Sequence, residues 1–165
     1  MPCDEIRPVA PERVLETRRL LLEPLTVAHA AGLYGPLLNR RLYDFVPQDP
    51  PATRRALEDR YLSLSARRSP DGSEAWLNWA ARERATGGYV GTLEATVHGN
   101  RTAAIAYAVF VPYRRRGFAA EGCERVLAHL FGGFGGRGRD RHPQRRVHGA
   151  RRVPGFRARL PPRKR

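Results

Sequence analysis

Residues 103–119 read AAIAYAVFVPYRRRGFA, and this stretch decides the fold. Its first nine residues are almost all apolar, which is typical of a strand in the middle of a sheet. A proline, a tyrosine, three arginines and a glycine follow. Apolar residues then recur at helical spacing at Val126, Leu127, Leu130 and Phe131. The stretch therefore predicts a buried strand, a basic turn and a helix, in that order.

The predicted turn has the parts of a phosphate-binding site. Backbone N–H groups at a helix N-terminus point toward a bound anion, and the helix dipole favours its negative charge. Gly117 has no Cβ and allows close approach, and the small Ala119 keeps the next turn open. The neighbouring arginines can reach phosphate oxygens. The spacing alone is equally consistent with a basic surface loop that caps an ordinary helix.

The residues before this stretch predict three more strands and two helices. Leucine-rich and aromatic runs that end at proline or glycine favour strands, and apolar residues every three or four positions favour helices. In chain order the predicted elements are a strand over 15–25, a helix from Thr26 to Gly35-Pro36, a helix over 51–64, and strands over 76–81 and 88–97.

Three features resemble the Gcn5-related N-acetyltransferase (GNAT) family. Arg114, Gly117 and Ala119 match the family's pyrophosphate motif, which is Gln or Arg, two residues, Gly, one residue, then Gly or Ala. The strand over 15–25 is similar to the opening of the branch that acetylates ribosomal-protein N-termini and many small molecules. Val90-Gly91-Thr92 resembles that branch's third strand. The resemblance implies an α/β (α+β) fold with a mixed, mostly antiparallel central sheet flanked by helices.

The same resemblance implies acetyl transfer from acetyl-CoA to a primary amine, by direct attack and without a metal. It implies that the backbones of Val109, Phe110 and Val111 bind the pantetheine arm. The residues implied for the pyrophosphate are Arg114, Arg115, Arg116, Gly117, Phe118 and Ala119. Glu94, on the strand over 88–97, is the candidate general base, and the alternative is a solvated carboxylate at the sheet edge. A ribosomal-protein N-terminus, an aminoglycoside and a polyamine all remain open as acceptor.

The charge of the chain is concentrated in its last residues. The formal net charge is +14, but residues 1–134 hold 18 arginines against 15 acidic residues, a net +3. Residues 135–165 hold 12 basic residues against Asp140 alone, a net +11. The alternative function is therefore non-specific nucleic-acid binding through this tail by phosphate neutralisation. Phe156 is the one aromatic residue among these arginines, which argues against specific recognition of single strands.

Composition divides the chain into a flexible lead (1–13), a middle segment (14–134) and an Arg-rich tail (135–165). The resemblance implies that the middle segment is an incomplete GNAT acetyltransferase domain. The tail is too polar to order itself and is expected to be disordered. The family continues here with a splayed fifth strand, a helix that supplies a proton donor, and closing strands. We therefore expect these C-terminal elements to be missing, the edge of the strand over 103–111 to be exposed, and catalysis to be weak or absent.

A shifted reading frame is our hypothesis for this change in composition. One choice of codons for residues 140–157, read one base later, encodes IDTRNAASMALAESLGF. That string is similar to the family's fifth strand and following helix, and it places the shift near residues 134–136.

Other sequence features favour a soluble cytoplasmic protein. No run of about 18 apolar residues could span a bilayer, and the N-terminus lacks a basic region followed by an apolar stretch. Cys3 and Cys123 are the only cysteines, which favours neither a disulfide framework nor a metal site.

Overall fold

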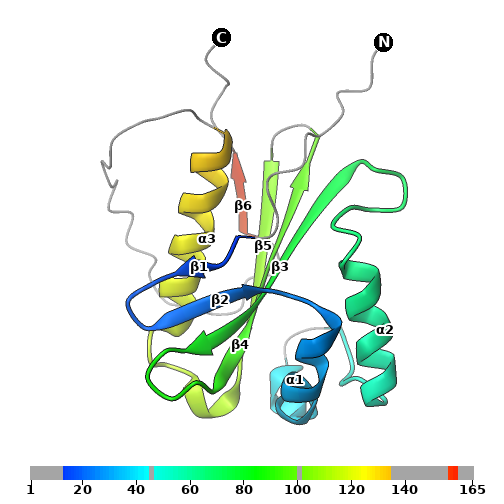
Figure 1. Cartoon of the computed structure of the whole chain (residues 1–165), viewed down its shortest axis with the longest axis vertical. Coiled ribbons are helices and arrows are strands. Elements are labelled where there is room, and N and C mark those ends of the chain that lie inside the picture. The colour runs from blue at the N-terminus through cyan, green and yellow to red at the C-terminus, as the bar shows by residue number, and fades with distance from the viewer. Residues whose placement is uncertain (1–12, 45–46, 100–101, 135–155, 160–165) are drawn as a thin grey trace.

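The computed structural model describes residues 13–44, 47–99, 102–134 and 156–159 of the chain. Six strands form one sheet in the order β1 to β6, and every pairing is antiparallel (Figure 1). The strands are β1 (Leu15–Glu16), β2 (Leu20–Pro24), β3 (Glu74–Glu83), β4 (Tyr89–His98), β5 (Thr102–Val109) and β6 (Phe156–Arg159). The α-helices are α1 (Ala30–Leu37), α2 (Arg54–Leu64) and α3 (Phe118–Phe134), and the short 3₁₀ helices are η1 (Val27–His29), η2 (Arg40–Leu42) and η3 (Val111–Tyr113).

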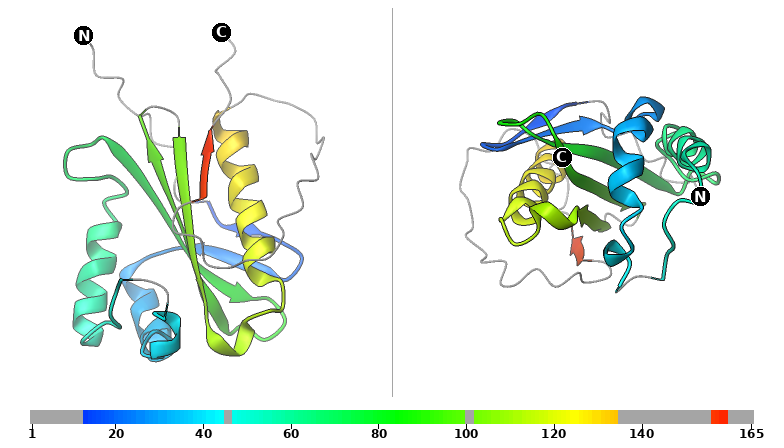
Figure 2. Two further views of the ribbon diagram at one scale, coloured as in Figure 1. Left: turned by 180° about the vertical axis from the view of Figure 1, so that it is seen from behind. Right: turned by 90° about the horizontal axis from the view of Figure 1, so that it is seen from below.

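The helices cover both faces of the sheet. Helix α3 packs on one face, where Val126 and Leu130 join the buried side chains of the strands, Trp79 among them. Helices α1 and α2 pack on the other face, where Leu33 and Leu57 form a second cluster (Figure 2). Strand β3 is buried continuously from Leu77 to Ala81 because both layers cover it. The predicted α/β fold, an antiparallel sheet flanked by helices, is confirmed.

The prediction of one continuous strand over 15–25 is wrong. The segment forms two short antiparallel strands, β1 and β2, joined by a tight turn at Thr17. The Thr17 N–H donates to the Leu20 carbonyl at 2.9 Å, and the Leu20 N–H donates to Thr17 Oγ1 at 2.7 Å. These local bonds reverse the chain where the sequence shows no glycine or proline.

Residues 103–119 form a strand, a turn and the start of a helix, as predicted. Strand β5 ends at Val109, two residues earlier than predicted, because Pro112 lies in the short helix η3. Residues 114–117 then connect η3 to α3, which has 17 residues.

The tail differs from expectation in one place. Residues 156–159 form β6, which pairs antiparallel with the first half of β5, from Thr102 to Ile105. This pairing gives hydrogen-bond partners to part of the β5 edge that was expected to be exposed. Residues 1–12 of the predicted lead (1–13), the remainder of the Arg-rich tail, and residues 135–136 of the proposed frame-shift position (134–136) lie outside the described residues.

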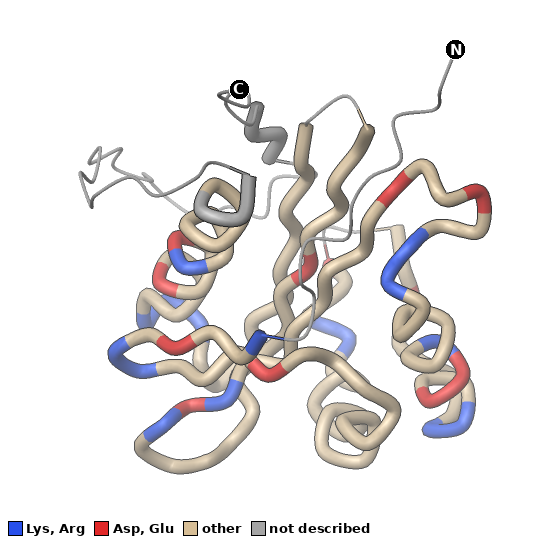
Figure 3. Tube along the Cα trace, turned by 45° about the horizontal axis from the view of Figure 1, so that its top comes forward, with Lys and Arg blue, Asp and Glu red and all other residues tan. Residues whose placement is uncertain are grey.

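Basic and acidic residues are both distributed over the described part of the chain (Figure 3). This agrees with the small net charge counted over residues 1–134. Among the described residues, none of the helices is both long and apolar enough to cross a membrane.

Candidate functional site

The turn before α3 presents free backbone N–H groups to solvent. Gly117 has φ +81° and Arg115 has φ +61°, so the chain passes twice through the left-handed region. Residues 114–117 are exposed. In the described part of the chain, the N–H groups of Gly117, Phe118, Ala119 and Ala120 have no hydrogen-bond partner. The first intrahelical bond here runs from the Glu121 N–H to the Gly117 carbonyl at 3.1 Å.

The three arginines of the turn have different surroundings. Arg114 folds back over the end of β5, with Nε 3.4 Å from the Val109 carbonyl and Nη2 2.8 Å from the Arg41 carbonyl. Arg116 lies over the Phe118 ring at 5.1 Å, and its Nη2 is 3.4 Å from Glu83 Oε1. Within the described residues the Arg115 guanidinium has no partner. Arg115 is therefore the arginine most available to a bound anion.

At the end of β5, the backbones of Val109 and Phe110 point toward opposite edges of the strand. The Phe110 N–H donates to the Val90 carbonyl at 2.8 Å, so its backbone points toward β4, and its side chain is buried. Because backbone direction alternates along a strand, Val109 turns its backbone groups toward the opposite edge. The register of β6 ends at Ile105, so this edge extends beyond β6. Of the three residues predicted for the pantetheine arm, Phe110 already has its N–H engaged.

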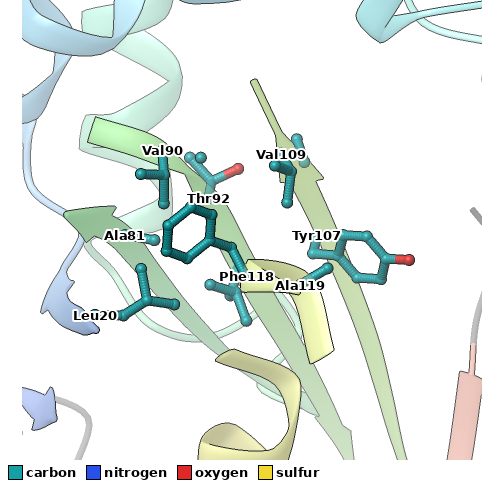
Figure 4. Close-up of a pocket in the computed structure, with 11 residues that line it drawn as sticks. Leu20, Ala81, Val90, Thr92, Tyr107, Val109, Phe118 and Ala119 are labelled. Atoms are coloured by element: carbon teal, nitrogen blue, oxygen red, sulfur yellow. The ribbon is translucent and has the colours of Figure 1, made fainter. Parts of the chain in front are cut away.

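A narrow apolar crevice lies beneath the turn, between α3 and the sheet. Figure 4 shows the Phe118 ring among Leu20, Val90 and Thr92, with Ala119 next to Tyr107. The first turn of α3 is therefore anchored by Phe118, which is buried.

A larger cleft of about 170 Å³ lies on the opposite face of the sheet. Leu25, which follows β2, and leucines from α1, α2 and β4 line it together with polar groups. Thr92 and Leu93 border both hollows. The polar side chains in its lining include Tyr43, Asp49, Arg60, Tyr61 and Glu94. The cleft can therefore hold an organic molecule with an apolar part and a cationic or polar group.

Glu94 lies in this cleft together with Tyr61. Burial raises the pKa of Tyr61; Arg60 lowers it and Glu94 raises it further, so the phenol stays protonated and can donate a hydrogen bond. Asn78 lies directly opposite Glu94 on β3 and is 5% exposed. Its Nδ2 has no hydrogen-bond partner in the described part of the chain. A molecule bound near Glu94 would give the Tyr61 hydroxyl, which also lines the cleft, a hydrogen-bond acceptor.

The sequence predicted a turn before a helix and Glu94 on a strand, and the structure has both. The sequence did not show that the turn and Glu94 lie on opposite faces of the sheet. Glu94 faces α1 and α2, whereas the turn begins the helix on the other face. Sequence reasoning missed Tyr61, Asn78 and Arg19, whose side chain reaches the turn from the first hairpin. No local pattern marks these residues, because each becomes relevant through a contact distant in sequence. No group of three His, Cys, Asp or Glu residues in the described ranges could hold a metal.

Comparison with known proteins gives the same fold. Residues 19–148 match the family model described as an acetyltransferase (GNAT) domain. A GCN5-related N-acetyltransferase from Brucella melitensis is similar in structure, with a TM-score of 0.59 and 21% identity over 76% of this chain and 57% of that one. A GNAT-family acetyltransferase from Bacillus anthracis gives a TM-score of 0.58 and 14% identity over 72% of this chain and 66% of that one.

A third similar structure is a Vibrio cholerae protein assigned as a ribosomal-protein-serine acetyltransferase. It gives a TM-score of 0.57 and 19% identity over 73% of this chain and 68% of that one. No curated protein matches the sequence. The chain thus spans less than two thirds of the Brucella and Bacillus proteins. Because the family model matches well over half of the chain, the chain belongs to the acetyltransferase (GNAT) domain family.

Proposed function

We propose that the chain is a cytoplasmic N-acetyltransferase that transfers an acetyl group from acetyl-CoA to a primary amine by direct attack. The observation that carries this proposal is the set of unpartnered N–H groups from Gly117 to Ala120 behind a left-handed glycine. A 17-residue helix adds its dipole to these groups. A doubly charged diphosphate is the part of coenzyme A that such a turn would bind best.

The coenzyme would run from this turn along the free edge of β5. Its diphosphate would lie against residues 114–119, with Arg115 free to pair with phosphate oxygens. The pantetheine arm would then accept from the N–H groups of Val109 and Val111, beyond the last residue paired with β6. The carbonyls of both residues already accept from Arg114. The buried Phe110 side chain and the hydrogen bond from its N–H to the Val90 carbonyl would hold this edge in position.

The amine acceptor would bind in the cleft on the α1 and α2 face. Glu94 lies opposite Ala106 on β5, three residues before Val109 and so about 10 Å away along the strand. Glu94 would accept the proton of the attacking amine, either directly or through one bridging water. Tyr61 would donate a hydrogen bond to the acceptor, and the leucines would contact its apolar part. A ribosomal-protein N-terminus or a small amine would suit this lining.

Calorimetry with coenzyme A and an acetyl-transfer assay with a panel of amines test this proposal. We expect Glu94→Gln to lower kcat by about 10²-fold or more while coenzyme A binding stays unchanged. Glu124→Gln is the matched control, because Glu124 is an exposed carboxylate on the outer side of α3. Equal transfer rates for both variants across pH would remove Glu94 from the reaction. Undetectable binding of coenzyme A by the parent chain would overturn the proposal as a whole.

We also propose that residues 135–165 come from a shifted reading frame. The composition change at Gly135, where arginine, glycine and proline replace the apolar helical pattern, supports this proposal. The family-model match, which runs to residue 148 in the given frame, counts against it. Resequencing the gene tests this, and the lack of any frame encoding the IDTRNAASMALAESLGF helix would refute it.

A chain cut after Phe134 distinguishes acetyl-CoA binding from the alternative function, nucleic-acid binding through the tail. In the cut chain, nucleic-acid affinity would vanish while coenzyme A affinity would remain.

A further inference from the structure

Three donors from the first hairpin meet one carboxylate of α3. Glu121 Oε1 accepts from Thr17 Oγ1 at 2.6 Å and from the Arg19 N–H at 2.8 Å. Glu121 Oε2 accepts from Arg19 Nε at 2.7 Å, and the Glu121 side chain is 19% exposed. These residues are about a hundred positions apart in sequence, so the hairpin is tied to the first turn of α3 by tertiary contacts alone.

The rest of the Arg19 side chain reaches the turn itself. Its Nη1 donates to the Arg116 carbonyl at 2.8 Å, and its guanidinium carbon lies 4.5 Å from the centre of the Phe118 ring. Its Nη2 lies 3.2 Å from the position that a Cβ on Gly117 would take. One arginine therefore bridges the Glu121 carboxylate and the backbone just before Gly117.

The bond to the Arg116 carbonyl has a consequence for the next N–H group. The Arg116 carbonyl and the Gly117 N–H belong to the same peptide, which is trans, so they point in opposite directions. Because Arg19 holds the carbonyl toward the hairpin, the Gly117 N–H is directed away from it and into solvent. The left-handed conformation of Arg115 is costly for a residue with a Cβ, whereas Gly117 adopts its positive φ freely, so an outside contact beside Arg115 helps to hold the turn.

Arg19 also offsets an unfavourable charge. Glu121 lies in the first turn of α3, where an unpaired carboxylate would repel a bound diphosphate. Burial raises the pKa of Glu121, but the hydrogen bonds from Thr17 and Arg19 outweigh this and lower it, so the carboxylate is charged at neutral pH. The paired Arg19 neutralises that charge beside the anion site.

We propose that Arg19 is a positioning residue for the diphosphate of coenzyme A, acting by orienting the Gly117 N–H through the Arg116 carbonyl. This inference rests on the proposed function and adds to it a residue outside the pyrophosphate motif of residues 114–119. Arg19 acts through the turn and needs no direct contact with the reacting atoms. The role requires the guanidinium fork, because Nε and Nη1 bond to two different groups at once.

Calorimetry with coenzyme A on the full chain tests the inference. Losing a charge-assisted hydrogen bond that orients a ligand-binding group predicts an increase in Kd of about tenfold or more for Arg19→Met. Arg19→Lys should weaken binding similarly, because lysine keeps the charge but not the fork. Arg84→Met is the matched control, since Arg84 donates to the Thr17 carbonyl of the same hairpin at 2.9 Å, and it should bind like the parent.

The double variant Arg19→Met with Glu121→Gln separates orientation from charge. If Arg19 orients the turn, the double variant stays weak, whereas full recovery of binding would overturn the inference. The amide resonance of Gly117 in ¹⁵N-labelled protein is the second readout. It should shift on adding coenzyme A to the parent and shift much less in Arg19→Met.

The outcomes also separate this inference from the proposed function. The inference alone would be overturned if Arg19→Met bound coenzyme A with the affinity of the parent and its Gly117 amide resonance moved as far as the parent's when coenzyme A is added. A parent chain that does not bind coenzyme A would overturn the proposed function and this inference with it.

Discussion

Replacing Gly117 with alanine tests the turn most directly, because two costs at this position can be separated. The first cost is conformational: at φ +81° a residue with a Cβ loses about 1 kcal/mol. For a chain of this length, that loss lowers the melting temperature by about 3 °C. The second cost is local to the site, because the new Cβ would lie 3.2 Å from Arg19 Nη2.

That contact is tighter than ordinary van der Waals contact, so the Arg19 side chain must shift away from the Arg116 carbonyl. The new methyl group also lies where a diphosphate would approach the N–H groups of the turn. Losing one charge-assisted hydrogen bond corresponds to about tenfold or more in affinity. We therefore expect Gly117→Ala to raise the Kd for coenzyme A by at least about tenfold, measured by calorimetry.

Gly72→Ala is the control for the conformational cost. Gly72 has φ +73°, and a Cβ there would meet nothing within 4 Å. Both variants should therefore lose similar melting temperature in scanning calorimetry, and only Gly117→Ala should lose coenzyme A affinity. Equal affinity in the two variants would refute the view that the bare backbone at Gly117 holds the diphosphate.

Three further predictions concern the fold around the site. Gly91→Ala would place a Cβ 1.9 Å from the Ala108 carbonyl oxygen, so we expect a loss of about 3 kcal/mol in urea unfolding, and a midpoint equal to the parent's would contradict this packing. Glu121 has a pKa lowered in the folded chain, so its stabilisation is present above pH 4.5 and is lost as pH falls through the folded pKa. Acid unfolding should therefore be less steep below pH 4.5 in Glu121→Gln, and identical acid profiles would argue against the pairing with Arg19. Burial raises the pKa of the Cys123 thiol to about 11, so peptide mapping after iodoacetamide treatment at pH 8 should find Cys123 unmodified in native protein, and rapid modification would mean that the α3 packing is wrong.

Part of the candidate site could be predicted because its signals are local. An apolar run, a glycine and a following helical pattern lie within about thirty residues, so a strand, a turn and a helix N-terminus follow from the order of residue types. The first hairpin could not be predicted in the same way. Its reversal depends on hydrogen bonds of the Thr17 backbone and hydroxyl, and the leucines on both sides read as one strand.

The sequence by itself determined that an apolar strand leads into a basic, glycine-containing turn and a long helix, and that Glu94 lies on a neighbouring strand. Only the tertiary structure decided that Glu94 opens into a cleft with Tyr61 on one face, while the turn begins the helix on the other. It alone brought Arg19 to the Arg116 carbonyl. The physical reason is that chain order sets local hydrogen bonding and side-chain periodicity, whereas contacts between distant residues exist only once the sheet and helices have packed.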